Sequence, residues 1–298
     1  MPATAQTRNS RARAWWLAAR AQTLSLSISP VLAGLALAWR QGAAPLWALA
    51  WATLLAALAI QIGANLLNDV GDFERGVDAP QRLGPPRAVA QGWLTARAVR
   101  LAGWLALGMA FVLGIGLVHA GGWPFAGLGL LALLCAWGYT AGPAPIACGP
   151  WGEMLVWLFF GLAAVCGSAA LQAASPNPAL CLTGHALGAL AAAVLLVNNT
   201  RDAATDAQAG RRTLALLLGP AGSRAFYALL LAQPYVVWPW LSGGQDWAAW
   251  PCLTLPWAIW LVWRFARLPA SRALNGLLAQ TARLQLAWTA LLALALLG

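Results

Sequence analysis

Charged residues are scarce in this sequence, and lysine is missing altogether. Only 9% of the 298 residues are charged and eight are acidic, whereas 61% are hydrophobic. An average soluble domain carries about 25% charged residues. Together with a mean hydropathy of +0.67, this composition argues against a water-soluble domain and indicates a protein that is embedded in lipid.

Metal-binding cysteine motifs are also absent from the sequence. Five cysteines are scattered along the chain, mostly inside apolar runs, and none has CxxC spacing. We therefore interpret them as small packing residues and expect neither a zinc site nor a disulfide framework.

Long apolar runs make up most of the chain. About 20 consecutive apolar residues are enough to cross a bilayer as a helix. We predict an all-α membrane protein with nine transmembrane helices, in which residues 1–20 form a basic N-terminal tail and residues 21–298 form one integral-membrane domain. The expected spans are 21–39, 44–67, 98–118, 123–141, 151–171, 179–198, 222–241, 247–265 and 278–297.

Arginine supplies all 18 positive charges and gives a net charge of +10. When residues that flank the loops are included, 17 of the 18 arginines lie on the side of the N-terminal tail, and only Arg40 lies on the other side. Because cytoplasmic loops collect positive charge, we predict a cytoplasmic N-terminus and an external C-terminus in the inner (plasma) membrane. Topology thus accounts for the basic balance, so we expect no nucleic-acid partner, and no obligate protein partner is evident.

Six of the eight acids lie in two polar segments, 65–78 and 198–206, which follow the second and sixth expected spans. A membrane protein that concentrates its few acids in two places is expected to use them together. The six are Asp69, Asp72, Glu74, Asp78, Asp202 and Asp206, and the other two acids are Glu153 and Asp246.

The spacing of the aspartates indicates a metal site. Asp69 and Asp72 are three residues apart and Asp202 and Asp206 are four apart, so on a helix each pair lies on one face. If the pairs face each other across a cavity, their repulsion requires a cation. Mg²⁺ prefers oxygen ligands of this kind and completes its shell with water and phosphate oxygens. Neutral amide groups are also available from Asn65, Asn68, Asn198 and Asn199.

Arginines are interleaved with these acids, and guanidinium groups match phosphate oxygens in pairs. Acids for Mg²⁺ beside arginines for phosphate predict a diphosphate site, and its position next to lipid predicts an apolar tail on that diphosphate. A solvated, salt-bridged surface is the alternative, but two clusters with six of eight acids favour a site. Glu153 is either a functional polar group or a charge at a helix N-terminus.

At these residues the chain resembles the UbiA superfamily of intramembrane aromatic prenyltransferases. The two segments are similar to the two Asp-rich motifs of that family. Further stretches resemble its 1,4-dihydroxy-2-naphthoate polyprenyltransferase branch, although Gln22 and Arg211 stand where that branch often has lysine. These stretches are Arg82-Leu-Gly-Pro-Pro-Arg87, Tyr139-Thr-Ala-Gly-Pro-Ala-Pro145, Gly152-Glu153…Phe159-Phe160-Gly161, Arg201-Asp202-x-x-Thr-Asp206 and Leu274-Asn275…Arg283.

The resemblance implies a helical bundle around a central cavity, with the Asp motifs at its cytoplasmic end. It implies transfer of a polyprenyl group from an allylic polyprenyl diphosphate to 1,4-dihydroxy-2-naphthoate, with decarboxylation, giving demethylmenaquinone in menaquinone biosynthesis. Mg²⁺ is the implied cofactor. The implied catalytic and metal residues are Asp69, Asp72, Asp202 and Asp206, with Asn68 also on the metal. The implied diphosphate contacts are Asn65, Asn68, Arg82, Arg87, Arg201 and Arg211, and the acceptor contacts are Tyr139, Asn199 and Arg20.

Two other interpretations remain open. Another aromatic acceptor, such as 4-hydroxybenzoate, is the first alternative, because nothing in the spacing excludes it. An ion transporter would place charged residues deep within its spans, whereas the expected spans are almost bare of charge.

Overall fold

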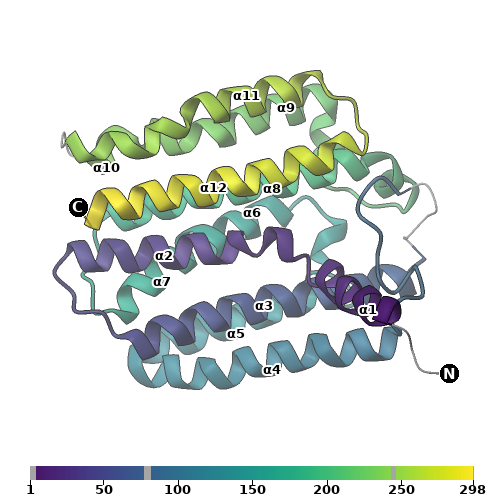
Figure 1. Cartoon of the computed structure of the whole chain (residues 1–298), viewed down its shortest axis with the longest axis horizontal. Helices are drawn as coiled ribbons and strands as arrows, with labels where there is room; N and C mark the ends of the chain where they lie inside the picture. Colours follow the sequence, from purple (N-terminus) through teal and green to yellow (C-terminus); the bar gives the residue numbers. More distant parts are fainter. Residues whose placement is uncertain (1–4, 77–81, 243–245, 298) are drawn as a thin grey trace.

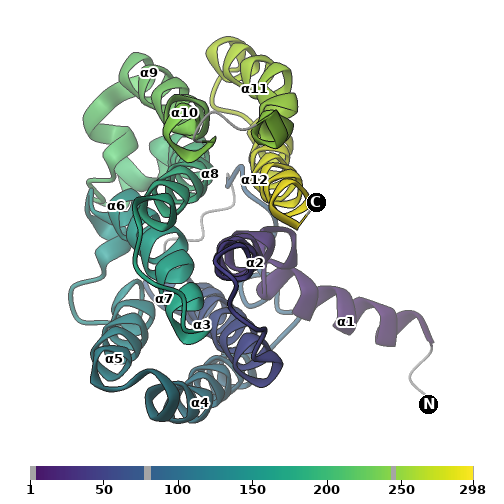
Figure 2. The same cartoon turned by 90° about the vertical axis from the view of Figure 1, so that its left-hand side faces the viewer.

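The computed structural model describes residues 5–76, 82–242 and 246–297, and every regular element in these ranges is helical. The long helices lie side by side along the molecule (Figure 1), and they form a ring when viewed down their axes (Figure 2). The all-α prediction is therefore confirmed. Asp78, which belongs to the first acidic segment, lies outside the described residues.

The described chain consists of long helices and a few short helical elements. One rod consists of α6 (Gly152–Trp157), the π-helix η3 (Leu158–Ala163) and α7 (Ala164–Leu171). Short elements are η1 (Ala21–Thr23), η2 (Ile146–Cys148), α10 (Trp238–Ser242) and the 3₁₀ stretch η4 (Asp246–Thr254). The others are α1 (Ala5–Ala18), α2 (Ser25–Arg40), α3 (Trp47–Glu74), α4 (Ala96–Gly121), α5 (Trp123–Gly138), α8 (Pro178–Gln208), α9 (Leu214–Val236), α11 (Leu255–Arg267) and α12 (Ala273–Leu297).

Seven helical stretches of the described chain are long and apolar enough to cross a membrane. The two remaining expected spans correspond to α5, which has 16 residues, and to η4 followed by the 13-residue α11. Pro251 and Pro256 lie in that second region, and proline removes a backbone donor and clashes with the preceding turn. The sequence 247–265 is therefore not one regular α-helix.

Helices α3 and α8 continue well beyond the expected ends of their spans at residues 67 and 198. Each helix stops just before a glycine with positive φ, Gly76 (φ 67°) after α3 and Gly210 (φ 70°) after α8. Such a glycine terminates a helix readily because it has no β-carbon to oppose the left-handed conformation. As a result, the first Asp segment is helical as far as Glu74 and the second is helical throughout, although both follow the expected spans.

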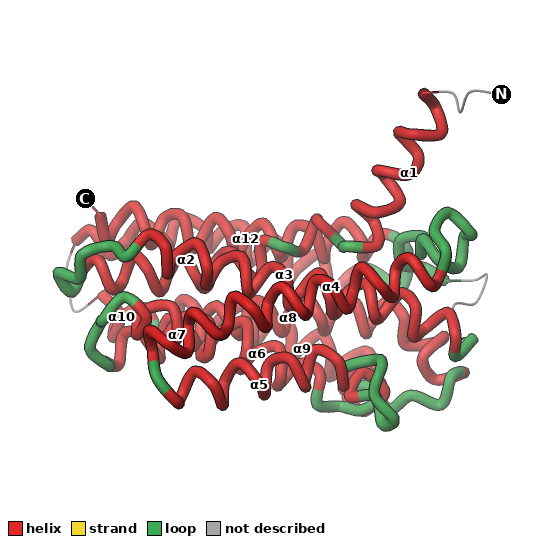
Figure 3. Tube along the Cα trace, turned by 90° about the horizontal axis from the view of Figure 1, so that it is seen from below, coloured by secondary structure: helices red, strands yellow, loops and turns green. Residues whose placement is uncertain are grey.

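The N-terminal segment, expected to be a tail, contains the helix α1. Residues 5–18 include neither glycine nor proline and are rich in alanine and arginine, which favour helix. Ala14 and Ala18 pack against Leu66 and Val70 of α3, and the rest of α1 leaves the bundle at an angle (Figure 3). The helix α1 and the end of α12 lie at opposite ends of the bundle (Figure 1).

The packing is tightest around α8. A β-carbon added to Gly161 of η3 or to Gly188 of α8 would collide with backbone atoms of the facing helix. The main core joins α8 to α2, α7, α9, α11 and α12 and includes the fully buried Leu187 and Trp288. Helices α3, α4 and α5 contribute only small apolar clusters, and they form one wall of the cavity described below.

Candidate active site

The two Asp segments form the final turns of α3 and α8, and all four aspartates are buried. Asp69 and Asp72 on α3 are 2% and 1% exposed, and Asp202 and Asp206 on α8 are 9% and 5% exposed. Buried carboxylates are costly unless cations or hydrogen-bond donors compensate them. Their partners therefore show how the site is built.

Arg211 joins the two segments. Its Nη2 donates to Asp72 Oδ1 at 2.5 Å and its Nη1 donates to Asp206 Oδ1 at 3.1 Å. Burial alone would lower the pKa of Arg211, but the two carboxylates outweigh burial and raise that pKa. One aspartate of each pair thus binds the same guanidinium group, so a cation lies between the ends of α3 and α8.

Asn68 and Asp72 hold two arginines that come from outside α3. Arg20 Nη2 and Arg87 Nη1 donate to Asn68 Oδ1 at 2.6 Å and 2.5 Å, and Arg87 also pairs with Asp72. Burial, together with the charges of Arg87 and Arg82, lowers the pKa of Arg20 to about 9. Arg20 is still protonated at pH 7, so three crowded cations make this end of the cavity attractive to an anion.

Arg201 organises the α8 side of the site. Its Nε and Nη2 donate to the two oxygens of Asp202 at 2.8 Å and 2.6 Å. Further bonds run to Asn198 and to Asn275 of α12, both at 2.7 Å. This pattern uses the fork geometry of the guanidinium group, which lysine lacks.

The loop that carries Arg82 and Arg87 is fitted to Arg201. Asn275 Nδ2 donates to the carbonyl oxygen of Leu83 at 3.0 Å, which ties this loop to α12. A β-carbon on Gly84 would lie 2.8 Å from Arg201 Nη2. A side chain at position 84 would therefore force the Arg201 guanidinium group to shift, and glycine permits the close approach of the loop.

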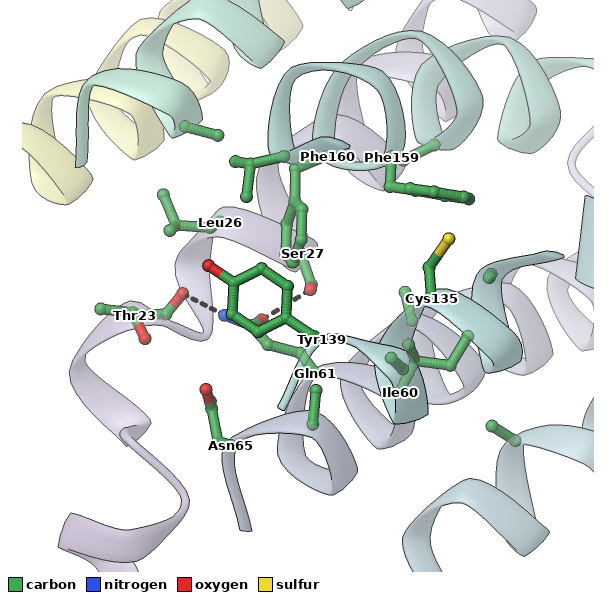
Figure 4. Close-up of a pocket in the computed structure, with 18 of the residues that line it drawn as sticks. Thr23, Leu26, Ser27, Ile60, Gln61, Asn65, Cys135, Tyr139, Phe159 and Phe160 are labelled. Atoms are coloured by element: carbon green, nitrogen blue, oxygen red, sulfur yellow. Dashed lines mark hydrogen bonds between the residues drawn. The ribbon is translucent and has the colours of Figure 1, made fainter. Parts of the chain in front are cut away.

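A cavity of about 660 Å³ extends from this charged end into the apolar interior. Its deep part is lined mainly by alanine, leucine and phenylalanine, among them Ala56, Leu117, Phe125 and Leu128. Figure 4 shows a middle section, with Gln61 and Tyr139 around the same space as Phe159 and Phe160. Eight predicted site residues line the cavity: Arg20, Asn65, Asn68, Asp69, Arg82, Arg87, Tyr139 and Arg201.

Five predicted site residues do not line this cavity. Asp72, Asp206 and Arg211 form the ion-pair cluster behind its charged end, and Asp202 lies behind Arg201. Asn199 Nδ2 donates to Glu153 Oε1 at 2.9 Å. Among the described residues no hydrogen-bond partner meets Glu153 Oε2, so Glu153 is a buried acid that Asn199 holds from one side.

Several lining residues had no predicted role: Gln22, Thr23, Ser27, Gln61 and Asn275. The helical period did carry a signal for Gln61, because positions 61, 65, 68 and 69 share one face of α3. Ser27 gave no comparable signal, and Asn275 was marked only by the family resemblance of the stretch 274–283. They belong to other helices, and only packing brings them to the site.

The donor atoms at this end have the chemistry that Mg²⁺ requires. They are carboxylate and amide oxygens from two helices, the ligand type that hard divalent cations prefer. Within the described parts of the chain, no three His, Cys, Asp or Glu side chains are close enough to form a metal-binding group. Asp72, Asp202 and Asp206 already pair with the cationic guanidinium groups of arginines. These carboxylates are therefore suited to a second cation, which would replace the arginines or bind beside them.

The sequence is also similar to proteins that are named as prenyltransferases. The 1,4-dihydroxy-2-naphthoate octaprenyltransferase of Escherichia coli (strain K12) is 38% identical over 229 residues, covering 74% of this chain and 74% of that protein. The protein of the same name from Bacillus subtilis (strain 168) is 32% identical over 240 residues, covering 80% and 76%. UbiA prenyltransferase domain-containing protein 1 of Gallus gallus is 31% identical over 285 residues, covering 92% and 81%.

Solved structures share the fold. The apo structure of a UbiA homolog from Aeropyrum pernix K1 has a TM-score of 0.68 at 17% identity, covering 93% of this chain and 97% of that chain. A UbiA homolog from Archaeoglobus fulgidus, bound to DMAPP and Mg²⁺, has a TM-score of 0.66 at 16% identity, covering 93% and 98%.

The sequence profile of the UbiA prenyltransferase family matches residues 27–276. This match contains both Asp segments, the loop 82–87 and Asn275, which together build the charged end of the cavity. It confirms the resemblance that the motifs indicated, and this chain belongs to the UbiA prenyltransferase family.

Proposed function

We propose that this protein transfers a polyprenyl group from an allylic polyprenyl diphosphate to 1,4-dihydroxy-2-naphthoate, with loss of carbon dioxide, in menaquinone biosynthesis. Relatives with 32–38% identity from several bacteria are named 1,4-dihydroxy-2-naphthoate octaprenyltransferase. The observation that carries the proposal is the form of the cavity. One continuous space joins an arginine- and asparagine-lined end to a long apolar interior, which suits a substrate with an anionic head and an apolar tail.

The charged end is suited to the departure of diphosphate. Arg20, Arg82 and Arg87 line it and present donors where negative charge grows as the bond between the allylic carbon and oxygen breaks. Arg201 adds a fourth guanidinium group, held in place by Asp202, Asn198 and Asn275. These groups are positioned before substrate binds, so little reorganisation is needed during the reaction.

Mg²⁺ would be held by Asn68, Asp69, Asp72, Asp202 and Asp206, and when bound it would neutralise charge on the diphosphate. The UbiA homolog from Archaeoglobus fulgidus was solved with DMAPP and Mg²⁺, which supports a metal in this protein also. Asp72 and Asp206 already share one cation, Arg211. Arg211 can therefore balance these carboxylates when no metal is bound.

The apolar interior protects the other product of bond cleavage. An allylic cation reacts with water, and a cavity lined by leucine, alanine and phenylalanine excludes water from it. The electron-rich ring of the acceptor is then the nucleophile that is present. We place Tyr139 beside that ring because it lines the cavity at the boundary between the charged and apolar parts.

The proposed topology has nine crossings, a cytoplasmic N-terminus and an active site that opens to the cytoplasm of a cell whose plasma membrane holds the protein. Helix α1 and the end of α12 lie at opposite ends of the bundle, which an odd number of crossings produces. Most of the arginines belong to the N-terminal segment, to helix ends or to loops on the side of the Asp segments, in agreement with the positive-inside rule; Arg224 and Arg283 lie inside α9 and α12, and Arg40 ends α2.

The test is an assay of purified protein in detergent with a polyprenyl diphosphate and 1,4-dihydroxy-2-naphthoate, with and without Mg²⁺, and with 4-hydroxybenzoate as a competing acceptor. We expect a Mg²⁺-dependent prenylated naphthoquinol and release of carbon dioxide. Product from 4-hydroxybenzoate alone would keep the reaction class and change the acceptor. If folded protein prenylates no aromatic acceptor, the transporter interpretation is open again.

A further inference from the structure

Two polar side chains lie in the wall of the cavity below its charged end. Ser27 of α2 and Gln61 of α3 are 4% and 7% exposed, and both line the cavity. Ser27 Oγ donates to Gln61 Oε1 at 2.6 Å, and Gln61 Nε2 donates to the carbonyl oxygen of Thr23 at 2.9 Å (Figure 4). These bonds orient the Gln61 amide at the cavity surface.

The pair retains capacity for one more partner. Gln61 has a second amide hydrogen and a second lone pair on Oε1, and Ser27 Oγ is still able to accept a hydrogen bond. Polar groups in an apolar wall gain from any ligand that satisfies them. A hydroxyl group, which both donates and accepts, matches this arrangement.

The depth of Gln61 matches the expected position of the acceptor ring. Gln61 precedes Asn65 by four residues and Asp69 by eight, which places it about 6 Å and about 12 Å deeper along α3. A diphosphate bound at the charged end leaves its allylic carbon just below that end. The acceptor carbon must approach this carbon to within about 3–3.5 Å, so the acceptor ring lies near the level of Gln61.

Aromatic side chains surround the same space. Phe159 and Phe160 both line the cavity and belong to the π-helix η3, a distortion that is frequent at functional sites. Tyr139 lines the cavity from the end of α5. Rings of this kind favour stacked or edge-to-face contact with an aromatic ligand.

We propose that Ser27 and Gln61 bind a ring hydroxyl group of the aromatic acceptor, while Tyr139, Phe159 and Phe160 contact its ring. This proposal rests on the proposed function and deepens it, because it names the residues that select a hydroxylated ring over one without a hydroxyl group. Ser27 and Gln61 then influence acceptor binding and leave binding of the diphosphate to the charged end.

The test compares binding of 1-hydroxy-2-naphthoate and 4-hydroxy-2-naphthoate with binding of 2-naphthoate, which lacks the ring hydroxyl group. Affinities are measured by isothermal titration calorimetry on the whole protein in detergent. We expect the wild-type protein to prefer at least one hydroxylated isomer by about 3- to 10-fold, the usual effect of one net hydrogen bond. Ser27→Ala should remove this preference and leave the affinity for 2-naphthoate unchanged.

The chain offers a matched control for each variant. Ser29 is a fully buried serine of the same helix that does not line the cavity, and Gln285 is a fully buried glutamine of α12 that likewise lies outside its wall. Ser29→Ala and Gln285→Leu should keep the hydroxyl preference, whereas Gln61→Leu should lose it. Thermal unfolding of each variant separates a loss of fold from a loss of selectivity.

The outcomes separate this proposal from the proposed function. If the wild-type protein binds no naphthoate, both fail. The proposed hydroxyl contact is wrong if the wild-type protein binds naphthoates with no hydroxyl preference. It is also wrong if Ser27→Ala and Gln61→Leu are folded and keep that preference. In both cases the proposed acceptor class stands. Loss of the hydroxyl preference in Ser27→Ala but not in Ser29→Ala supports the proposed contact of Ser27 and Gln61 with the ring hydroxyl group.

Discussion

The final turns of α3 and α8 carry similar residues, an asparagine followed by two aspartates, yet the structure compensates their charges differently. On α3, Asp72 pairs with Arg87 and Arg211, which lie 15 and 139 residues away in the sequence. On α8, Asp202 pairs with the adjacent Arg201. The α3 segment is therefore a point where distant loops converge, whereas the acids of the α8 segment pair with arginines close to them in the sequence, Asp202 with Arg201 and Asp206 with Arg211.

This difference predicts that substitutions in the two segments have different effects on stability. Loss of Asp72 on α3 releases arginines that are distant in the sequence, whereas loss of Asp202 on α8 releases the adjacent Arg201, which keeps its bonds to Asn198 and Asn275. If both segments bind one metal, activity should respond equally to either loss, while stability should not.

The largest expected effect is on turnover. Asp69→Asn and Asp202→Asn should each reduce kcat by at least about 100- to 1,000-fold, because each removes charge that stabilises the bound metal and diphosphate. Turnover is measured with purified protein, and size-exclusion chromatography verifies the fold. Near-normal activity in either variant would remove that residue from the metal site and end the equivalence of the two segments.

Stability in the absence of substrate should distinguish the segments. Asp72→Asn leaves Arg87 and Arg211 without their shared carboxylate, a loss of about 3 kcal/mol for a buried ion pair. Asp202→Asn should cost less, about 1–2 kcal/mol, since Arg201 keeps Asn198 and Asn275. Thermal unfolding followed by tryptophan fluorescence gives the comparison. An equal or reversed order would contradict the account of how these charges are balanced.

Lysine substitutions should sharpen the contrast between Arg201 and Arg211. Arg201→Lys should raise the KM for the diphosphate donor by about 10-fold, because an ammonium group cannot reproduce a two-pronged bond to Asp202 and reach both amides. Arg211→Lys should change this KM by about 3-fold or less, since a point charge can still lie between two carboxylates. A larger effect at Arg211 would show that its fork geometry is required.

The smallest effects concern the glycines that end the two helices. Gly76→Ala and Gly210→Ala should each destabilise the protein by about 1–2 kcal/mol, because a side chain opposes the left-handed conformation. Neither should change kcat, since a β-carbon at either position meets no atom of the described residues within 4 Å beyond its chain neighbours. A fall in kcat in one variant alone would show that its helix end controls the geometry of the site.

Helix ends also show how far the sequence could be interpreted. The apolar runs predicted where α3 and α8 lie but not how far they extend, because composition changes at the membrane boundary while the backbone continues. Gly76 and Gly210 marked the true ends. Asp72, Asp202 and Asp206, which lie between boundary and glycine, bond through their side chains to arginines and so do not compete for the backbone of the helix.

Residue type and spacing along one helix determined much of this protein. The composition determined an all-helical membrane protein, and the spacing of the aspartates determined that each pair shares a face. The motifs determined the family. These properties are local, since they depend on hydropathy and on the helical period, and both can be counted along the chain.

Tertiary structure decided which groups meet. Arg20 reaches Asn68, Arg201 reaches Asn275, and Ser27 reaches Gln61 across 48, 74 and 34 residues. Such partners depend on how helices pack and on where a glycine such as Gly84 permits close approach. No period along the chain encodes these contacts, because their free energy arises only after the helices have come together.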